Sequence, residues 1–270
     1  MQLSVIITTY NSPVWLEKVL WGYTQQSHHD FEIIIGDDGS GQETQACIDR
    51  FRNETNLDIK HLWQEDNGFR KCHILNQCIL EASAEYLVFT DGDCIPRHDF
   101  LETHAREARQ GCFLSGGYHK LPMTTSEKIA KDDILSGRCF DLAWLKSNGL
   151  QSSYKNKKLT ASPQAAKFYN AITPTKCNFK GSNASAWKAD IINVNGFDER
   201  MVWGGLDREL GARLKNAGIK PKHVRYNAVV LHLDHKRGYK DPAAVQENKN
   251  IRLRIEKEGI TWTEWGIRKA

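Results

Sequence analysis

The sequence of 270 residues lacks a long apolar segment and a charged amino-terminal leader. A helix needs about 20 mostly apolar residues to cross a bilayer, and no run in this chain approaches that length. The first residues, MQLSVII, have the composition of a strand and not that of a secretion signal. We therefore expect a cytoplasmic protein.

Cysteine pairs, an excess of one charge and glycine-rich phosphate loops are also missing. The seven cysteines include no CxxC pair and are odd in number, which disfavours a zinc site or a complete disulfide framework and favours a reducing compartment. The 37 basic and 33 acidic residues give a net charge of +4, too small and too evenly spread to indicate a nucleic-acid partner. Without a Walker A sequence or a GxGxxG loop, P-loop and dinucleotide-binding sites are disfavoured.

What is present is a regular alternation of strand and helix patterns over the first hundred residues. Continuous apolar and β-branched runs predict strands, and amphipathic segments between them predict helices. The predicted strands are Leu3–Thr9, 31–36, Ile59–Trp63 and 86–91, and the predicted helices begin at Pro13 and cover 42–52 and 72–82. This order is typical of an α/β fold with a parallel, right-handed β/α sheet.

The pattern changes after the fourth strand. A helix over 98–110 and a strand over 112–118 are predicted, followed by an irregular segment, 121–176, with short amphipathic pieces and loops. We interpret this segment as an insertion that serves as a lid or as an acceptor-recognition element, the alternative being a solvated excursion without function. Strand patterns return at 178–187 and 229–231, with a helical pattern between them.

Polar side chains follow three of the predicted strands. Thr9, Asp38 and Asp91 stand at or just after strand ends, and Asp93 follows Asp91 after one glycine. Because the carboxyl ends of parallel strands meet at one edge of a sheet, we expect these groups to border one crevice. Two carboxylates so close together repel each other unless a cation joins them, and Mg²⁺ or Mn²⁺ suits such oxygen ligands. The alternative is a solvated Asp-Gly-Asp turn.

The second half of the chain carries a further carboxylate and two histidines. Asp207 follows a Trp-Gly-Gly sequence at 203–205 and lies near a predicted helix start, where it either caps the helix or acts as a general base towards a hydroxyl group. Trp203 would offer an apolar face to a sugar ring. His232 and His235 follow the last predicted strand. Strand alternation puts them on different faces, so at most one is expected to bind a metal ion.

Taken in order, these motifs resemble those of a family 2 glycosyltransferase of the GT-A fold. They are SVIITTYN at 4–11, GDDGS at 36–40, DGD at 91–93, NGFD at 195–198 and WGG at 203–205, with Asp207 and His232. The second half is similar to the galactosyltransferase-type C-terminal module, and the resemblance covers nearly the whole chain. It implies an α/β fold with a Rossmann-like, mostly parallel sheet flanked by helices and an inserted helical and loop segment.

The resemblance also implies one GT-A domain over residues 1–270. Its parts are a nucleotide-sugar-binding half (1–118), an insertion and acceptor region (119–177), an acceptor and catalytic half (178–240) and a carboxy-terminal tail (241–270). In the tail, Trp262, Trp265 and Ile267 lie close to Arg268 and Lys269. This combination suits either a peripheral membrane contact or packing on the catalytic domain.

The nucleotide-sugar site follows from the same resemblance. Thr9 and Asp38 contact the uridine part of a UDP-sugar, and Asp91 and Asp93 form the DXD motif. Of the two, Asp93 is the residue expected to bind a Mn²⁺ or Mg²⁺ ion directly, ahead of Asp91. Arg70 and the lysine after it either reach the diphosphate or form a solvated basic pair.

The resemblance assigns the remaining roles to the second half. Asp207 matches the base of an inverting transfer, and Trp203 and Gly204 belong to the nucleotide-sugar site. His232 matches a third metal ligand, a role for which His235 competes. The residue before Asp207, often a glutamate in the family, is a leucine here.

The implied activity is metal-dependent, inverting transfer of a sugar from a UDP-sugar to a glycan or lipid-linked acceptor in polysaccharide or lipopolysaccharide biosynthesis. One alternative, a sugar-nucleotide pyrophosphorylase, should have a glycine-rich, arginine-containing loop after the first strand, where this chain has Tyr-Asn-Ser-Pro at 10–13. The other, a catalytically silent sugar-binding module, has no need to retain the carboxylates and the histidine together. The expected location is the cytoplasm, either free in it or at the inner face of the membrane.

Overall fold

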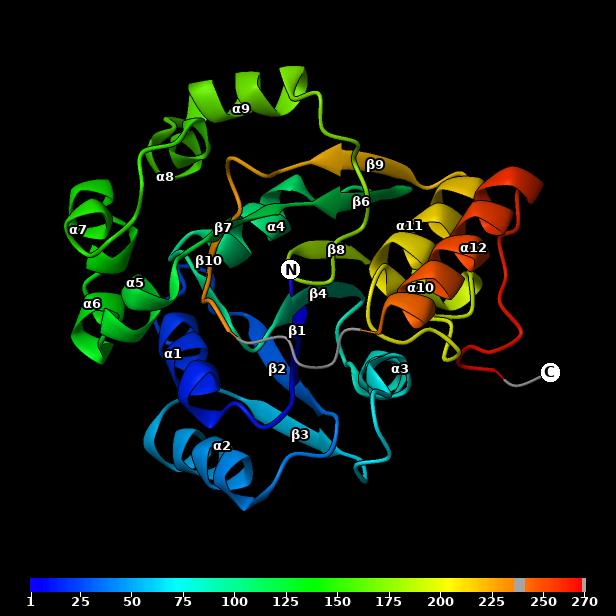
Figure 1. Cartoon of the computed structure of the whole chain (residues 1–270), viewed down its shortest axis with the longest axis horizontal. Coiled ribbons are helices and arrows are strands. Elements are labelled where there is room, and N and C mark those ends of the chain that lie inside the picture. The colour runs from blue at the N-terminus through cyan, green and yellow to red at the C-terminus, as the bar shows by residue number, and fades with distance from the viewer. Residues whose placement is uncertain (236–240, 269–270) are drawn as a thin grey trace.

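The computed structural model of the chain describes residues 1–235 and 241–268. A seven-stranded sheet crosses the middle of the molecule in the order β3-β2-β1-β4-β8-β6-β9, with helices on both of its faces (Figure 1). Its strands are β1 (Leu3–Thr9), β2 (Phe31–Asp37), β3 (Ile59–Trp63), β4 (Tyr86–Asp91), β6 (Cys112–Ser115), β8 (Ala184–Trp187) and β9 (Lys220–His223). Neighbouring strands are parallel except at β8, which is antiparallel to β4 and β6. The predicted α/β fold with a mostly parallel sheet is confirmed.

Helices separate the first strands, as the sequence pattern predicts. They are α1 (Pro13–Tyr23), α2 (Gln42–Glu54), α3 (Lys71–Glu81) and α4 (Phe100–Glu107). Every residue of β1 is buried, because helices cover both faces of the sheet. Val5 of β1 belongs to an apolar cluster with α1 and α2, and its neighbour Ile6 belongs to a second cluster with α3 on the other face. The alternation of side chains along one strand thus ties the two helix layers together.

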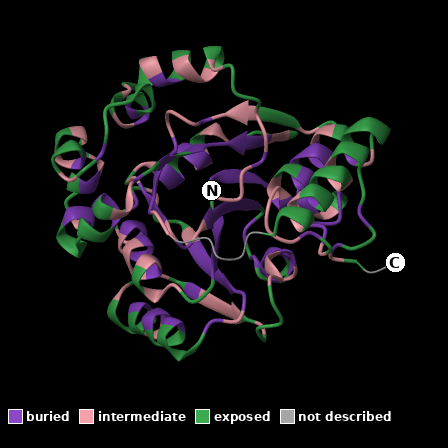
Figure 2. Ribbon diagram, viewed as in Figure 1, coloured by how far each residue is buried: buried purple, intermediate pink, exposed green. Residues whose placement is uncertain are grey.

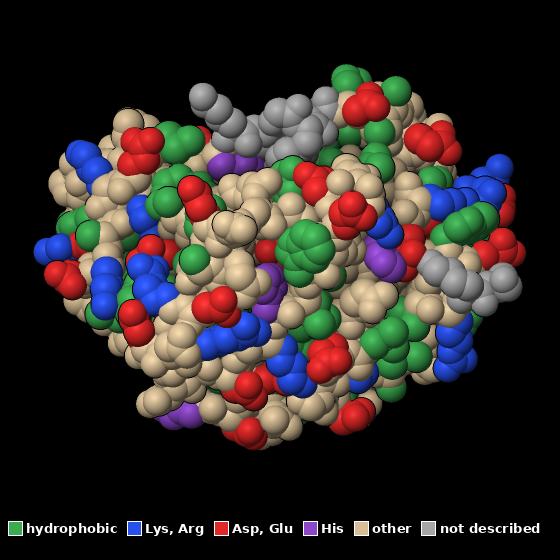
Figure 3. Space-filling view, turned by 90° about the horizontal axis from the view of Figure 1, so that it is seen from below, with side chains coloured by type: hydrophobic (Ala, Val, Ile, Leu, Met, Phe, Trp, Pro, Cys, Tyr) green, Lys and Arg blue, Asp and Glu red, His purple; other side chains and the backbone are tan. Residues whose placement is uncertain are grey.

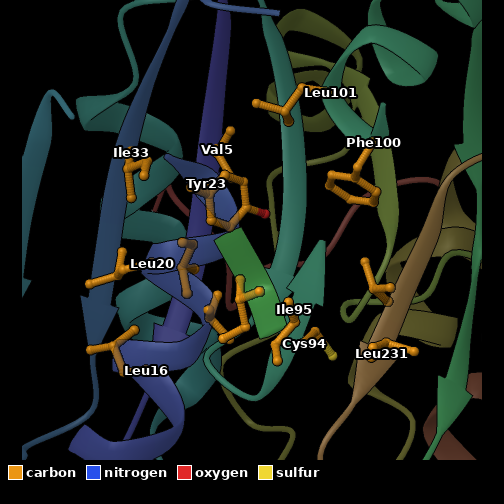
Figure 4. Close-up of a cluster of buried hydrophobic side chains, with 14 of the residues drawn as sticks. Val5, Leu16, Leu20, Tyr23, Ile33, Cys94, Ile95, Phe100, Leu101 and Leu231 are labelled. Atoms are coloured by element: carbon orange, nitrogen blue, oxygen red, sulfur yellow. The ribbon is translucent and has the colours of Figure 1, made fainter. Parts of the chain in front are cut away.

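The first apolar cluster joins the large sheet to α1 and to a short strand that follows the DGD motif. Figure 4 shows side chains of α1 gathered beside the strands that they cover. Its labelled members are Val5, Leu16, Leu20, Tyr23, Ile33, Cys94, Ile95, Phe100, Leu101 and Leu231. Cys94 directly follows Asp93, so the packing of this cluster fixes the chain on which the DGD motif ends.

A second, three-stranded sheet lies beside the large one in the order β5-β10-β7. Its strands are β5 (Cys94–Pro96), β7 (Gly117–Lys120) and β10 (Val229–His232). The single strand predicted over 112–118 is therefore wrong: it divides at Gly116 into β6 of the large sheet and β7 of the small one. A Cβ atom at Gly116 would lie 2.0 Å from Oδ1 of Asn183, so only glycine lets the chain turn there.

Asn183 is fully buried and holds the junction of the two sheets. Its Nδ2 donates to the carbonyl oxygens of Gly117 at 3.2 Å and Ala228 at 3.0 Å, and its Oδ1 lies 3.1 Å from Nε2 of His104 in α4. The strand predicted over 178–187 begins only at Ala184, because this turn occupies the residues before it.

The segment predicted as an insertion forms an arc of short helices along one side of the molecule (Figure 1). They are α5 (Met123–Lys128), α6 (Lys131–Leu135), α7 (Leu142–Ser147), α8 (Lys157–Thr160) and α9 (Pro163–Ile172), with 3₁₀ turns at Arg138–Phe140 and Tyr154–Asn156. Ile134 and Leu145 belong to the first apolar cluster, whereas α9 is largely exposed (Figure 2). The first half of the arc is therefore anchored to the core.

The carboxy-terminal part adds α10 (Lys188–Asn193), α11 (Leu206–Asn216) and α12 (Pro242–Glu258) on the side of α3. Beyond α12, the tail packs on the NGFD motif: Asn195 donates from Nδ2 to the Thr263 carbonyl at 2.7 Å, and the Trp265 ring lies 3.4 Å from the Arg200 guanidinium. These contacts favour packing over a free membrane-binding segment, and Lys269 lies outside the described residues.

No helix within residues 1–235 and 241–268 is long and apolar enough to span a membrane. On the face shown in Figure 3, basic and acidic side chains are interspersed, without a continuous basic stripe. The absence of a nucleic-acid partner stays a prediction.

Candidate active site

The predicted meeting of three strand ends is confirmed by the sheet register. Thr9 at the end of β1 pairs with Asp37 of β2, and Thr8 pairs with Asp91 of β4. The amide of Gly92 donates to the Thr8 carbonyl at 2.8 Å, and a Cβ atom there would lie 3.0 Å from that oxygen. Glycine at this position thus lets the DGD motif pass close to the end of β1, with Asp91 before Gly92 and Asp93 after it.

The two carboxylates of the DGD motif have different partners. Asp91 accepts hydrogen bonds from Thr8 Oγ1 at 3.1 Å and from Lys71 Nζ at 2.6 Å. Burial alone would lower the pKa of Lys71, but the ion pair with Asp91 and the charges of Asp93 and Asp207 raise it overall. Lys71 is therefore not a solvated cation, and it lies in the field of three acids that are far apart in the sequence.

Asp93 faces both histidines. Its Oδ2 lies 3.1 Å from Nε2 of His235 and 3.7 Å from Nε2 of His232, and the two imidazoles stack with centroids 5.7 Å apart. The argument that strand alternation separates the histidines is wrong, because β10 ends at His232 and the chain turns before His235. Burial alone would raise the pKa of Asp93, but the histidines hold it below its usual value, so the carboxylate is ionised.

His232 is held in one orientation. Its Nδ1 lies 2.8 Å from the Leu233 carbonyl, to which a protonated Nδ1 donates, so that Nε2 is left with its lone pair towards Asp93. The ring of the exposed Tyr118, in β7, lies 5.0 Å from the imidazole between ring centroids. Nothing in the sequence marked Tyr118, because its role comes from the pairing of β7 with β10.

Among the described residues, Asp93, Cys94 and His232 form a group of potential metal ligands, whose ligand atoms lie within 4.8 Å of one another. Burial raises the pKa of the Cys94 thiol well above its usual range, and a protonated thiol is a poor ligand. The remaining carboxylate and imidazole, with His235 beside them, form a mixed oxygen and nitrogen donor set, which suits Mn²⁺ better than the oxygen-preferring Mg²⁺. The residues present therefore fit the expected divalent ion.

The loops after β1 and β2 are fastened to each other. The amide of Asp38 donates to the Thr9 carbonyl at 3.1 Å, and the Asp38 carboxylate accepts hydrogen bonds from the Gln64 side chain and from the Arg70 amide, the latter at 3.0 Å. Arg70 thus reaches Asp38 through its backbone. The hydroxyl of Thr9 is buried and has no hydrogen-bond partner within the described residues. A buried, unsatisfied hydroxyl at this position suits a contact with a ligand.

Asp207 lies in the first turn of α11, which begins after the left-handed Gly205. Its carboxylate accepts hydrogen bonds from the amides of Gly181 at 3.2 Å and Arg208 at 2.8 Å. Burial raises its pKa, an effect to which the nearby negative charge of Asp91 adds. The predicted position at a helix start is confirmed, and a carboxylate with a raised pKa suits the acceptance of a proton from a hydroxyl group.

The Trp203-Gly204 loop is held by α12, which the sequence did not connect to the site. Nδ2 of the buried Asn248 donates to the carbonyl oxygens of Val202 at 2.8 Å and Gly204 at 3.0 Å. At Gly204, φ is 108°, and a Cβ atom would lie 3.0 Å from Val245. The position of the loop before Asp207 therefore depends on a helix far along the chain.

Two family models match the chain. The model of "Glycosyl transferase family 2" matches residues 4–168, and the model described as "N-terminal domain of galactosyltransferase" matches residues 167–236. The two matches meet at residues 167–168, within the predicted insertion, and together they include each of the predicted site residues.

The chain is also similar to individual proteins. Over 268 residues the chain is 24% identical to a hyaluronan synthase of Pasteurella multocida, covering 96% of this chain but only 27% of the synthase. The structure of Staphylococcus aureus TarS 1–349 in complex with UDP-GlcNAc is similar with a TM-score of 0.62 at 16% identity, covering 96% of this chain and 69% of that one. The mannosyltransferase PcManGT of Pyrobaculum calidifontis, in complex with GDP-Man and Mn²⁺, is similar with a TM-score of 0.59 at 16% identity, covering 96% and 71%.

Proposed function

Because the chain belongs to glycosyl transferase family 2, we propose that it moves a sugar from a UDP-sugar to an acceptor hydroxyl with inversion, in a reaction that needs a divalent metal ion. The chain is a glycosyltransferase with the GT-A fold. The observation that carries the finer proposal is the meeting of Asp93 and two histidines with Asp91, Lys71 and Asp207 at one end of the sheet.

The donor side of the proposal rests on the loops after β1 and β2. The unsatisfied hydroxyl of Thr9 and the carboxylate of Asp38 lie where the uridine is expected, and Arg70 fixes Asp38 through its amide. The similarity to TarS, solved with UDP-GlcNAc, supports a nucleotide-sugar donor.

A Mn²⁺ or Mg²⁺ ion would be held by Asp93 and His232. When bound, such an ion neutralises the negative charge that grows on the leaving diphosphate. Lys71 already balances Asp91, so Asp93 is the acid of the DGD motif that is left for the metal. The complex of PcManGT with Mn²⁺ supports a divalent ion, and the choice between the two metals is open to the assay below.

Asp207 would act as the general base. It takes the proton of the acceptor hydroxyl while that oxygen bonds to the anomeric carbon and the bond from this carbon to the diphosphate breaks. A single in-line displacement of this kind inverts the anomeric centre. The raised pKa of Asp207 brings it nearer to the range of an effective base.

The acceptor in this proposal is a glycan or a lipid-linked glycan in polysaccharide biosynthesis, which the similarity to a hyaluronan synthase supports. A cytoplasmic location fits the seven cysteines, all of which are free. We further propose that residues 119–177 contribute to acceptor recognition within one GT-A domain.

The test is a screen of UDP-sugars for hydrolysis and transfer, with Mn²⁺, Mg²⁺ or EDTA, on the wild type and on Asp93→Asn. We expect metal-dependent turnover of at least one donor by the wild type, reduced at least about a hundredfold in the variant. UDP should also raise the melting temperature in the presence of Mn²⁺. Binding without turnover would indicate a silent module, and formation of UDP-sugar from UTP and a sugar phosphate would indicate a pyrophosphorylase.

A further inference from the structure

Three cationic side chains gather behind β7 without forming a salt bridge within the part of the chain that the structure describes. They are Lys158 of α8, Lys180 in the loop before β8 and Arg225 in the turn between β9 and β10, and we name them the cationic cluster. A Cβ atom at Gly117 would lie 3.6 Å from both Lys158 Nζ and Arg225 Nε, so these two cations share a narrow space. In Figure 1 the turn from β9 to β10 passes close to α8.

Lys158 is buried, with only 6% of its surface exposed, and its Nζ donates to the Tyr118 carbonyl at 2.8 Å. Burial, with the charges of Arg225 and Lys180, lowers its pKa to about 7. A buried lysine is normally paired with an acid, and here a single carbonyl is the partner. The Lys158 side chain is therefore only partly protonated near pH 7, and an anion bound beside it would favour its charged form.

Arg225 has the same deficit. Its Nε and Nη1 atoms are buried and have no hydrogen-bond partner within the described residues. Buried hydrogen-bond donors nearly always have an acceptor, so two buried donors without one on the same guanidinium indicate a site for a ligand. The planar fork of arginine matches a carboxylate or a phosphate group, which accepts two parallel hydrogen bonds.

Cys177 and Asp207 oppose the lowering of the Lys180 pKa by burial, but neither forms a salt bridge with the cationic cluster within the described residues. The neighbouring histidines do not supply negative charge either. Burial lowers the pKa of His119 to about 4, so this side chain is neutral at pH 7. His223 is neutral there too, since burial lowers its pKa, and its Nε2 lies 2.9 Å from the Thr175 carbonyl. Lys155, which is exposed, adds further positive charge.

The cationic cluster adjoins the candidate active site on the side of Asp207. Lys180 precedes Gly181, whose amide donates to the Asp207 carboxylate at 3.2 Å. Tyr118, whose carbonyl accepts a hydrogen bond from Lys158, has its ring 5.0 Å from that of His232 and tilted against it. The predicted uridine contacts come from β1 and β2 instead, whereas β9 is at the opposite edge of the large sheet from β3. The cluster is thus placed for the acceptor and away from the nucleoside.

We propose that the cationic cluster is an acceptor subsite that binds a carboxylate or phosphate group of an acidic acceptor. Binding there would hold a neighbouring sugar hydroxyl towards Asp207. The acceptor role rests on the proposed glycosyl transfer, whereas the binding of an oxyanion by Lys158, Lys180 and Arg225 does not.

The first experiment measures melting temperature against the concentration of inorganic phosphate. Phosphate should stabilise the wild type, and this stabilisation should be lost in Arg225→Gln and in Lys180→Gln. Lys157→Gln removes an exposed lysine next to Lys158 and should respond as the wild type does. Equal stabilisation of the wild type and of Arg225→Gln, or of Lys180→Gln should the first variant not fold, would overturn the proposal.

The second experiment separates the acceptor from the donor. UDP with Mn²⁺ should raise the melting temperature of Arg225→Gln as it does that of the wild type. Loss of this UDP response in the variant alone would mean that the cluster binds the donor diphosphate, which overturns the proposal. If UDP stabilises neither protein while phosphate still stabilises the wild type, the proposed glycosyl transfer fails and the oxyanion site stands.

Acceptor kinetics then identify the anion. With the donor found in the screen, the wild type should use a methyl glucuronide or a glucose phosphate as acceptor better than a methyl glucoside. The more efficient of the two acidic acceptors shows whether the subsite prefers a carboxylate or a phosphate group. In Arg225→Gln, KM for the acidic acceptor should rise about ten- to a hundredfold, the range for a lost charged hydrogen bond, while KM for the neutral one stays constant. Parallel changes for both acceptors would contradict a charge-specific subsite.

Discussion

The carboxylate of Asp93 lies 3.1 Å from Nε2 of His235, a histidine that stands beyond the end of its strand. His232, at the strand end, is slightly farther from Asp93 at 3.7 Å, but its ring is fixed by the Leu233 carbonyl. The imidazole of His235 is thus nearer to Asp93 but less constrained than that of His232. Mutation of each histidine can show which of them is the stronger metal ligand.

We predict that His232→Ala weakens metal dependence more than His235→Ala does. An imidazole with a fixed tautomer binds a metal ion better, because its lone pair is already aimed. The Mn²⁺ concentration for half-maximal turnover should rise about ten- to a hundredfold in His232→Ala. His98→Ala, which changes an exposed histidine, is the control. The reverse ranking would assign the ligand role to His235.

Replacing Asp207 by Asn should keep UDP-sugar binding and lower turnover by roughly two to four orders of magnitude. The amide keeps the shape of the side chain, and its single oxygen can still accept one of the two hydrogen bonds from Gly181 and Arg208, but it cannot take a proton. Steady-state kinetics and UDP binding on the same sample measure both effects. Full turnover with a lower melting temperature would make Asp207 a helix cap only.

Asn248→Ala should lower turnover by up to about a hundredfold, the cost of a small misplacement near the reacting groups. Asn248 acts through the Trp203-Gly204 loop, whose carbonyls it holds. The informative readout is kcat well below the melting temperature, together with UDP affinity. Asn250→Ala, on an exposed position of α12, should change neither. A lower melting temperature with unchanged kcat would restrict Asn248 to a structural role.

Acid should destabilise the protein through His104. Burial lowers the pKa of His104 to about 4 from an ordinary 6.5, since its ring is enclosed beside Ser185 and Asn183. The unfolded chain takes up a proton below pH 6.5 that the folded chain refuses. The free energy of unfolding should therefore fall by on the order of 3 kcal/mol as the pH drops through this range.

Urea unfolding at several pH values checks this expectation. Between pH 6.5 and pH 4, the stability of His104→Gln should decline less steeply than that of the wild type. The control His98→Gln, at an exposed position, should decline as steeply as the wild type. An unchanged slope in His104→Gln would assign the acid sensitivity to other groups. An imidazole of His104 that titrates near pH 6.5 by NMR would contradict its burial as a neutral ring.

Ending the chain at Gly259 should unfold the protein or sharply lower its melting temperature. The tail contributes the Thr263 hydroxyl, which donates to Asp198 at 2.8 Å, and the Arg268 amide, which donates to Asn195 at 2.8 Å. Removal of the tail breaks the hydrogen bonds of the buried Asn195 and uncovers the second apolar cluster, against which Ile267 packs. Thermal unfolding of the full and shortened chains measures the loss.

The same tail can be tested for membrane binding with a milder change. Trp262 and Trp265 are 41% and 40% exposed. Co-sedimentation of the full chain with anionic vesicles should be unchanged by Trp262→Ser. A clear fall in the bound fraction would restore the membrane contact that the sequence left open.

The sequence was sufficient for the parts of the site that depend on local patterns. Thr9, Asp38 and Asp91 follow strands whose apolar runs are continuous, and parallel pairing then brings the strand ends together. Asp207 was placed by the glycines before its helix. The loss of regularity at 121–176 likewise marked the helical arc.

The parts that the sequence did not reveal depend on contacts between distant segments. The break at Gly116 follows from the position of Asn183, and the meeting of His235 with Asp93 follows from where β10 ends. Asn248 and Arg225 carry no local signal, because their partners are set by packing. Such contacts appear only once the chain is folded.

The buried Asn183 has a consequence for how the molecule opens. Asn183 stands directly before β8 of the large sheet, and its side chain bonds to α4, to the start of β7 and to the residue before β10, so it links the small sheet to the large one. The small sheet therefore has no separate stability: any excursion that frees β10 must break hydrogen bonds inside the shared interior. The amide protons of the strand that carries His232 should therefore exchange with solvent only when the whole domain unfolds. Adaptation to substrates is left to the loops and the outer helices.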